Sequence, residues 1–155
     1  MEPILEIQGL KKHYPILGGV LRREVNSVKA LDGVTLTVNR GECLGIVGES
    51  GCGKTTMGKA IIRLHDPTSG KIIYRAREKG TARDGADIAS LSPAQLKKLG
   101  LRAKLQMVFQ DPSTSMNPPM LVKHIVAEPL KEQTRLRGRE LEERVVEMLS
   151  LVGLG

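Results

Sequence analysis

The fold class follows from the stretch Gly48-Glu49-Ser50-Gly51-Cys52-Gly53-Lys54-Thr55. It matches the pattern G-x-x-x-x-G-K-[ST], in which glycines let the backbone curl so that successive amides point at phosphate oxygens. The apolar run at residues 43–47 precedes it and is typical of a central parallel strand. A helix follows, with Met57, Ala60, Ile61 and Leu64 on one face, and we expect it to end at Asp66-Pro67. The order of strand, glycine-rich loop and helix predicts an α/β protein with a phosphate-binding loop.

The side chains of this loop predict a triphosphate ligand with Mg²⁺. Lys54 would reach the β- and γ-phosphates as a mobile charge, while the Thr55 hydroxyl would bind Mg²⁺ and Thr56 would be a further phosphate donor. The helix that begins near Lys54 would add the positive end of its dipole. The alternative is a glycine-rich turn whose lysine faces water. The predicted nucleotide-binding residues of the loop are Gly48, Glu49, Ser50, Gly51, Cys52, Gly53, Lys54, Thr55 and Thr56.

Both cysteines stand apart from any metal-binding pattern. Cys43 and Cys52 have no C-x-x-C spacing and no clustered histidines, so neither a zinc site nor a disulfide framework is expected, and a reducing cytosol fits best. Cys52 lies in the loop near a helix N-terminus, which favours the thiolate. We hypothesise that Cys52 alkylates readily and that ATP protects it. The alternative is that Cys52 is a small tolerated residue with no chemistry.

Composition and charge narrow the class of protein. The 155 residues are 40% hydrophobic and 26% charged, as in an ordinary soluble domain, which excludes disordered, collagen-like and coiled-coil chains. The net charge of +7 permits nucleic acid, anionic lipid or a phosphorylated small molecule as partner. Nucleic acid is disfavoured because stacking platforms are scarce; the only aromatic residues are Tyr14, Tyr74 and Phe109. No signal peptide or membrane-spanning segment is expected.

Hydrophobic periodicity and turn residues predict the remaining elements. Strands are expected at 4–8, 34–38, 71–74 and 105–109, with residues 11–29 as loop or hairpin and 75–87 as an exposed hairpin or loop. Ser92 with Gln95 forms a capping-box signature for a short helix closed by Gly100. Two later helices are expected, at 121–130, bent or ended by Pro129, and at 139–152, with Leu141, Val145, Met148 and Val152 on one face.

A series of short motifs identifies the chain as similar to a known family. In order they are Leu10-Lys11-Lys12-His13-Tyr14, Ala30-Leu31-Asp32-Gly33-Val34, Gly41-Glu42, the phosphate loop, Thr68-Ser69-Gly70 and Gln106-Met107-Val108-Phe109-Gln110-Asp111-Pro112. The series resembles the nucleotide-binding subunit of ATP-binding cassette (ABC) transporters. Met116-Asn117-Pro118 and Ala127-Glu128-Pro129-Leu130 extend the likeness to the ATPase subunits of bacterial dipeptide and oligopeptide importers, over essentially all 155 residues.

The resemblance implies a fold and a division of the chain. The fold would be the phosphate-loop ABC nucleotide-binding domain, a mixed sheet around the phosphate-loop helix plus an antiparallel β-subdomain, incomplete at the C-terminus. Residues 1–155 would form the N-terminal part of one such domain. Residues 1–89 would form the core with the antiparallel strands and the phosphate loop. Residues 90–155 would hold the Q-loop and the start of the helical subdomain.

The resemblance also implies roles and partners. Tyr14 matches the aromatic residue that stacks on adenine, the alternative being an ordinary loop tyrosine. Gln110 matches the Q-loop glutamine, which joins the Mg²⁺ shell with Thr55 and senses the γ-phosphate, the alternative being a strand-capping amide. The implied ligands are ATP and Mg²⁺. The implied partners are a second ABC ATPase subunit and the transmembrane permease subunits, at the cytoplasmic face of the inner membrane, with peptide uptake as the function.

Three family motifs do not occur among the 155 residues. Leu91-Ser92-Pro93-Ala94-Gln95 resembles the LSGGQ signature but precedes the Q-loop and contains proline, so it is interpreted as a helix start. No apolar run ends in Asp-Glu as a Walker B strand does, and His124 is a poor substitute for a switch histidine. Only Lys54 and Gln110 would contribute to catalysis, so little turnover is expected of this chain by itself. The alternative function is a noncatalytic nucleotide-binding or interaction module, and a GTPase or nucleotide kinase is disfavoured because no NKxD-type motif occurs.

Overall fold

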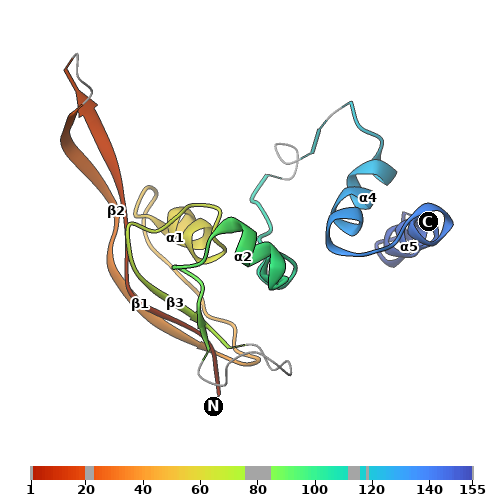
Figure 1. Cartoon of the computed structure of the whole chain (residues 1–155), viewed down its shortest axis with the longest axis horizontal. Helices are drawn as coiled ribbons and strands as arrows, with labels where there is room; N and C mark the ends of the chain where they lie inside the picture. The colour runs from red at the N-terminus through yellow and green to blue at the C-terminus, as the bar shows by residue number, and fades with distance from the viewer. Residues whose placement is uncertain (1, 20–22, 76–84, 112–115, 118, 155) are drawn as a thin grey trace. The chain divides into compact units, whose positions relative to one another are not determined.

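The computed structural model describes residues 2–19, 23–75, 85–111, 116–117 and 119–154. The chain forms two units, residues 1–107 and residues 108–155. The first contains the sheet and the phosphate loop, and the second contains the last two helices (Figure 1). Among the helices described, none has the combination of length and apolarity that crossing a bilayer requires.

The first unit is built on an antiparallel sheet in the order β2-β1-β3-β4. Its strands are β1 (Pro3–Gly18), β2 (Arg23–Asn39), β3 (Ser69–Tyr74) and β4 (Ala86–Asp87). In the centre of the sheet β1 pairs on both sides, with Ile7 opposite Leu36 of β2 and Ile72 of β3. The strands expected at 4–8, 34–38 and 71–74 are confirmed, and so is the antiparallel β-subdomain.

The core of the first unit joins the sheet to three short helices, α1 (Lys54–Ile61), α2 (Pro93–Lys98) and α3 (Leu101–Lys104). The strands β1, β2 and β3, the three helices and the residue after β4 all contribute buried apolar side chains: Ile7, Leu10, Leu31, Met57, Ala60, Ile72, Ile88, Leu96 and Leu101. Ser92 caps α2 with the expected capping box, in which its Oγ accepts from the Gln95 amide at 3.3 Å. Gly100 follows in the left-handed conformation and ends the helix as expected.

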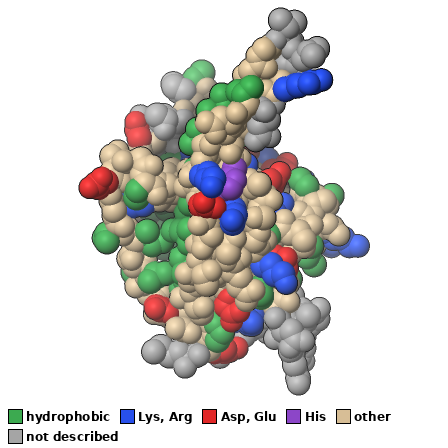
Figure 2. All heavy atoms as spheres, turned by 90° about the vertical axis from the view of Figure 1, so that its left-hand side faces the viewer, with side chains coloured by type: hydrophobic (Ala, Val, Ile, Leu, Met, Phe, Trp, Pro, Cys, Tyr) green, Lys and Arg blue, Asp and Glu red, His purple; other side chains and the backbone are tan. Residues whose placement is uncertain are grey.

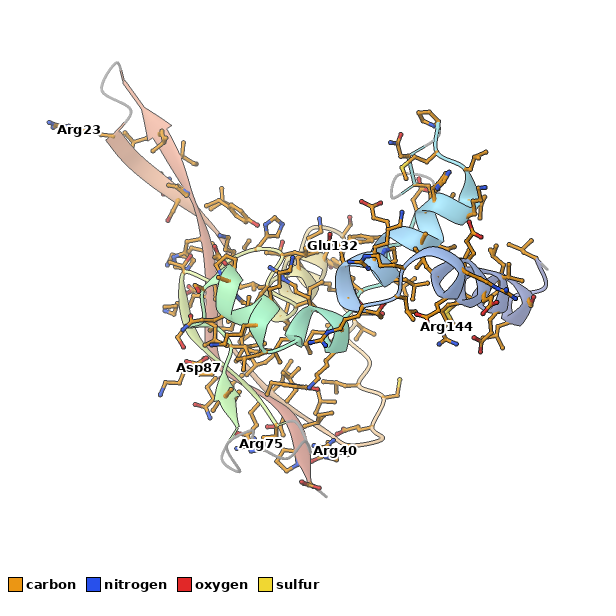
Figure 3. All side chains as sticks on the ribbon, turned by 45° about the vertical axis from the view of Figure 1, so that its right-hand side comes forward. Arg23, Arg40, Arg75, Asp87, Glu132 and Arg144 are labelled. Atoms are coloured by element: carbon orange, nitrogen blue, oxygen red, sulfur yellow. The ribbon has the colours of Figure 1, made fainter. Side chains whose placement is uncertain are left out.

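Ion pairs and hydrogen bonds fix the end of the sheet where β1 begins. Arg75 pairs with Glu6 at 2.6 Å, and Arg40 donates to the Arg75 carbonyl at 2.6 Å. Figure 3 shows Arg40 and Arg75 at this end of the sheet and Arg23 at the far tip of the β1–β2 ribbon. The three strands that meet here are therefore joined by side chains as well as by their ladders.

The second unit is a pair of helices, α4 (Val122–Gln133) and α5 (Gly138–Leu151). They pack through Ala127 of α4 and through Leu141 and Val145 of α5. Both helices are confirmed, but α4 continues through Pro129 to Gln133 rather than ending there. Of the expected α5 face, Val152 lies past the helix end and is exposed.

Within the segment 11–29, expected as loop or hairpin, the described residues up to Gly18 pair with those from Arg23 as a two-stranded ribbon, so the hairpin alternative is correct. The register shifts at several points, among them between Lys12 and His13 and between Ile16 and Leu17. Each of these two shifts leaves one residue of β2 without a partner on β1, which disturbs the regular alternation of side chains along the ribbon. Beyond the sheet the ribbon also exposes Ile16, Leu17, Val25 and Val28, so no face is marked as buried.

Two expected strands are wrong. Residues 43–47 and 105–109 have no strand structure, and Val47 and Val108 are 94% and 95% exposed. A strand exists only when neighbouring strands pair with its amides and carbonyls, and within the described residues no strand pairs with either segment. Their apolar composition was detected correctly, but composition does not supply partners.

The remaining corrections concern element ends. α1 stops at Ile61 rather than at Asp66, because Arg63 adopts a left-handed conformation, and Leu64 is half exposed. Of the expected loop or hairpin at 75–87, residues 76–84 lie outside the described residues. Ala86 and Asp87 pair antiparallel with Tyr74 and Ile73.

Candidate functional site

The phosphate loop is positioned by its contact with β2. Gly53 is the N-cap residue of α1, with φ of 95°, a conformation that side chains disfavour. A Cβ at Gly53 would overlap the carbonyl oxygen of Ala30 and lie 3.3 Å from Cδ2 of Leu31. Glycine is therefore required both for the backbone conformation and for the close approach to the strand. The contact between Gly53 and β2 therefore positions the loop relative to the sheet.

Lys54 folds back over its own loop. Its Nζ donates to the carbonyl oxygens of Gly48 and Glu49, each at 2.6 Å, and lies 3.4 Å from the Sγ of Cys52. The ammonium thus lies where the loop curls rather than facing open water. A phosphate oxygen at this point would offer the ammonium a charged acceptor in place of neutral carbonyls, and charge-assisted hydrogen bonds are the stronger kind.

The first turn of α1 adds donors beside this ammonium. The amides of a helix's first turn have no intrahelical acceptor, and no acidic side chain occupies this turn to offset the dipole. Thr55 is exposed and Thr56 is half-buried. Ammonium, amides and hydroxyls are the donor set that a triphosphate requires, so the residues present fit that ligand.

The same residues fit Mg²⁺ in the form that accompanies a nucleotide. In the described part of the chain, no group of three or more His, Cys, Asp or Glu side chains could hold a metal ion. Mg²⁺ at nucleotide sites takes one or two protein ligands together with phosphate oxygens and waters. The exposed hydroxyl of Thr55 is a ligand of this kind.

Tyr14 lies on β1, opposite Val28 of β2. Tyr14 is 36% exposed, with Lys12 Nζ 4.9 Å from the ring centroid and the His65 ring edge-on with its centroid 6.3 Å away. The cation and the imidazole hold the ring in place while part of it remains accessible. Tyr14 is therefore a strand residue, not the loop residue that the alternative prediction assumed.

Gln110 belongs to the second unit, where it is exposed and outside any helix or strand. The strand expected to end at Gln110 is not formed, so the interpretation of Gln110 as a strand-capping amide has no support. Its expected role toward Mg²⁺ stays a prediction. Of the Q-loop region that the resemblance implies around Gln110, residues 112–115 and 118 lie outside the described residues.

The sequence reasoning missed a charged cluster on the face of the sheet. Asp32 pairs with Lys11 and His13, both at 3.3 Å, and with Lys29 at 3.4 Å, and Figure 2 shows a histidine next to basic and acidic side chains on one face of the molecule. The hydrogen bond from Lys11, aided by the charge of Lys29 and the contact with His13, holds the pKa of Asp32 below its usual value despite some desolvation. The signal was available, since Lys11 and His13 alternate along a strand, but it required the hairpin register.

The reasoning also missed Arg63, which is buried beyond the end of α1. Nothing near Arg63 in the sequence indicates its burial, because its guanidinium binds the carbonyls of Ala89 and Leu91, far along the chain.

Comparison with known proteins gives a consistent set of matches. The model of the family described as "ABC transporter" matches residues 31–155. The chain is 45% identical over 153 residues to the oligopeptide transport ATP-binding protein AppF of Bacillus subtilis (strain 168), covering 99% of this chain and 44% of that protein. It is 40% identical to the dipeptide transport ATP-binding protein DppF of Escherichia coli (strain K12), covering 99% and 42%. The chain thus spans less than half the length of these relatives.

Solved structures agree with this result. The dimeric structure of the bacterial ABC transporter cassette MJ0796 is similar with a TM-score of 0.73 at 26% identity, covering 97% of this chain and 58% of that one. A post-hydrolysis state of the same cassette bound to ADP and Pi gives 0.72 at 25% identity, with the same coverage.

Proposed function

The chain belongs to the ABC transporter family, and on that premise we propose that it carries the MgATP-binding residues of a subunit that couples ATP binding and hydrolysis to the import of dipeptides or oligopeptides. The cargo class is inferred from the printed names of the relatives. The observation that carries the proposal is the Lys54 ammonium, held 2.6 Å from the Gly48 and Glu49 carbonyls inside a loop that Gly53 anchors on β2.

In this proposal each part of the site has one task. Backbone amides of residues 48–53 and the first turn of α1 bind the phosphates, and Lys54 moves from its carbonyl acceptors to the β- and γ-phosphate oxygens. Thr55 would hold Mg²⁺, which when bound neutralises charge between those phosphates. A role for Gln110 toward Mg²⁺ rests on its place in the motif series alone. Tyr14 offers adenine a π-face, a contact that gives affinity without strict readout of the base.

The proposed assembly follows the relatives. The chain would act with a second ABC ATPase subunit and with transmembrane permease subunits, peripherally, at the cytoplasmic face of the membrane. The dimeric cassette among the similar structures supports the first partner, and the transport names of the relatives support the second. The charge of +7 suits a triphosphate and an adjacent anionic membrane surface.

Calorimetric titration of the 155-residue chain with MgATP tests nucleotide binding. Lys54→Ala should weaken binding at least tenfold, because it removes a charge-assisted contact. Lys59→Ala is the matched control, since Lys59 lies in the last turn of the same helix, and its affinity should equal that of the unmodified chain. Equal affinity for both variants would refute the assignment.

The role of Tyr14 can be separated from that of the loop. Tyr14→Phe keeps a ring and Tyr14→Ala removes it, so only the second should weaken MgATP binding, by about tenfold. Binding of inorganic triphosphate, which has no base, should be the same in both variants. A loss of triphosphate affinity in Tyr14→Ala would show that the ring supports the fold rather than the base.

A second candidate function is nucleotide binding without turnover. The observation that favours it is the absence of any Asp-Glu pair from the 155 residues, since such a pair would supply the catalytic carboxylate. Steady-state hydrolysis by the 155-residue chain separates the two candidates. Turnover that Lys54→Ala abolishes supports the ATPase, while MgATP binding without turnover supports the second candidate for this chain.

A further inference from the structure

The C-terminal end of α1 has an unusual cap. The Arg63 amide donates to the Ala60 carbonyl at 3.1 Å and the Leu64 amide donates to the Lys59 carbonyl at 2.9 Å, which together form a Schellman motif. The left-handed residue of such a motif is usually glycine, whereas here it is Arg63, with φ of 58°. A side chain in this conformation is disfavoured, so the contacts of the arginine must offset the strain.

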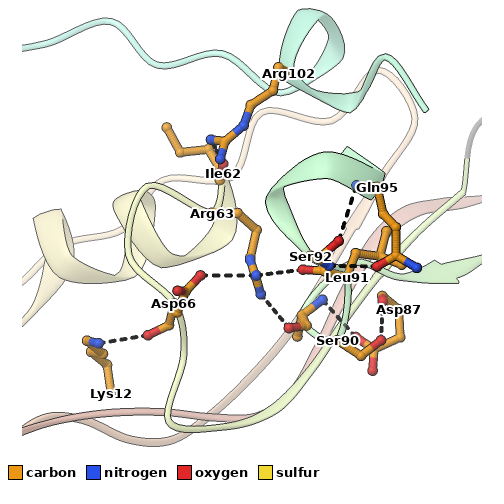
Figure 4. A network of polar contacts seen from close by, with 11 residues as sticks. Lys12, Ile62, Arg63, Asp66, Asp87, Ser90, Leu91, Ser92, Gln95 and Arg102 are labelled. Atoms are coloured by element: carbon orange, nitrogen blue, oxygen red, sulfur yellow. Dashed lines mark hydrogen bonds and ion pairs between the residues drawn. The ribbon is translucent and has the colours of Figure 1, made fainter. Parts of the chain in front are cut away.

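Those contacts are made by a buried guanidinium. Arg63 is 7% exposed; it donates to the carbonyls of Ala89 and of Leu91, the latter at 2.9 Å, and pairs with Asp66 at 3.0 Å (Figure 4). The two carbonyls belong to the turn between β4 and α2. A planar fork that spans two acceptors of one turn fixes orientation as well as distance, which a lysine cannot do.

The turn that Arg63 binds is itself ordered. The Asp87 carboxylate accepts from the Ala89 amide at 3.0 Å, and the Ser90 hydroxyl donates to the Asp87 carbonyl at 2.9 Å. The capping box of Ser92 and Gln95 then begins α2 directly after Leu91. The guanidinium therefore joins the end of α1 to the start of α2 through a segment with little freedom to absorb movement.

Two further contacts join α1 to the segment that follows α2. Arg102 of α3 donates to the Ile62 carbonyl at 3.4 Å, beside Arg63. The Met107 methyl lies against α1, since a Cβ at Gly58 would be 3.4 Å from it. α3 ends at Lys104, six residues before Gln110 in the sequence. All these contacts lie within the first unit.

We propose that Arg63 is a positioning residue that couples the phosphate loop to α2 and α3, so that nucleotide binding at the N-terminal end of α1 changes the stability of these two helices. α1 is an eight-residue helix with continuous internal hydrogen bonds, so its two ends move together. The loop holds one end, and Arg63, aided by Arg102, holds the other. The inference rests on the proposed nucleotide site and adds a path from that site to the segment before Gln110.

Hydrogen–deuterium exchange of the 155-residue chain with and without saturating MgATP tests the coupling. In the unmodified chain MgATP should slow exchange at least fivefold in residues 48–57 and also in residues 93–104. Arg63→Lys keeps the charge but not the fork, and Arg63→Gly relieves the strain but removes the side chain. Both should retain the slowing in the loop and lose it in α2 and α3.

A control variant distinguishes coupling by Arg63 from a role of Arg63 in stability alone. Leu96→Ala removes a buried side chain of α2 without touching the contacts of Arg63, so it should lower stability yet keep the MgATP response of residues 93–104. Arg102→Gln, at an exposed site, should reduce that response only in part. The coupling is overturned if the unmodified chain binds MgATP with no change in residues 93–104, or if Arg63→Gly keeps the change.

Failure of the proposed function gives a separate result. If calorimetry shows that the unmodified chain does not bind MgATP, the nucleotide site is refuted, and the link itself is then judged without ligand. Arg63→Gly should speed exchange of α2 and α3 amides at least tenfold more than that of β1 and β3 amides. Equal acceleration in both regions would refute the link as well.

Discussion

The phosphate loop has two flanks, and the protein holds them in different ways. On the C-terminal side α1 buries Met57 and Ala60 in the core and ends in the contacts of Arg63. On the N-terminal side residues 43–47 lie outside any helix or strand and are exposed, although four of the five residues are apolar. The loop is thus fixed from one side, by α1 and by the contact of Gly53 with β2.

The difference shows what each kind of secondary structure requires. A helix satisfies most of its backbone within its own segment, so a few buried side chains suffice to anchor α1. A strand satisfies its backbone only through neighbours, and apolar side chains cannot replace them. Three of the four predictions that follow compare a residue of the loop or of α1 with a residue of the exposed flank. The fourth concerns β2, the strand that supports the loop.

The largest effect is expected from truncation of the anchored flank. Met57→Ala should lower the free energy of unfolding by about 2–5 kcal/mol, because the side chain is 5% exposed and leaves a cavity. Val47→Ala should change it by less than about 0.5 kcal/mol. Urea denaturation of both variants measures the difference. Similar losses would mean that residues 43–47 are buried in solution.

Replacing a glycine with alanine should also cost more stability on the anchored flank than on the exposed one. Gly53→Ala forces a side chain into a left-handed conformation and against the Ala30 carbonyl, so a loss of about 2 kcal/mol is expected. Gly45→Ala meets nothing within 4 Å, so stability should be nearly unchanged. Thermal unfolding of the pair, followed by circular dichroism, is sufficient. A tolerated alanine at 53 would show that the loop is not seated on β2.

The two free and exposed cysteines report on ligand binding from either flank. Because Cys52 lies in the proposed phosphate site, MgATP at about ten times its Kd should slow alkylation of Cys52 about tenfold. Cys43, outside the loop, should react at the same rate with and without nucleotide. Mass spectrometry of each peptide measures both rates. Equal slowing at both positions would assign the protection to a global change rather than to occupancy.

The smallest effect concerns Asp32, which follows Ala30 and Leu31 on the strand that supports the loop. The Lys11 hydrogen bond lowers the pKa of Asp32 from 3.8 in the folded chain. A lowered folded pKa contributes stability above the unfolded value, and that contribution is lost as the pH falls through the folded pKa. Between about pH 5 and about pH 3, Asp32→Asn should therefore lose less stability than the unmodified chain. Urea denaturation at a series of pH values measures the free energy of unfolding of both proteins. An equal loss with falling pH in both would contradict this prediction.

Local signals predicted much of the fold. The phosphate-loop helix, the capping box at Ser92 and the two later helices all depend on residues within a few positions of one another, and each is present. The motif series predicted the family, which the comparisons show. Within the site, the loop could be predicted from the sequence because its glycines and Lys54 all lie within residues 48–54.

The features that could not be predicted depend on distant residues. Residues 43–47 lack strand structure because no described strand pairs with them, and an apolar run does not show whether a pairing partner exists. The cluster around Asp32 required the register of a ribbon whose bulges hide its alternation. Arg63 is buried by a turn that lies 26 residues further along the chain. In each case the deciding residue is far from the segment that it affects.

The pairing of β1 also has a kinetic consequence. Its contacts with β2 join residues close in the sequence, such as Gly18 and Arg23, and hairpins of this kind form in about 1–10 μs. Its contacts with β3 join residues such as Leu5 and Tyr74, so they must close a segment of about 70 residues and form more slowly. The phosphate loop and α1 lie inside that segment. The proposed nucleotide site should therefore be among the last parts of the first unit to assemble, after the pairing of β1 with β2 is complete.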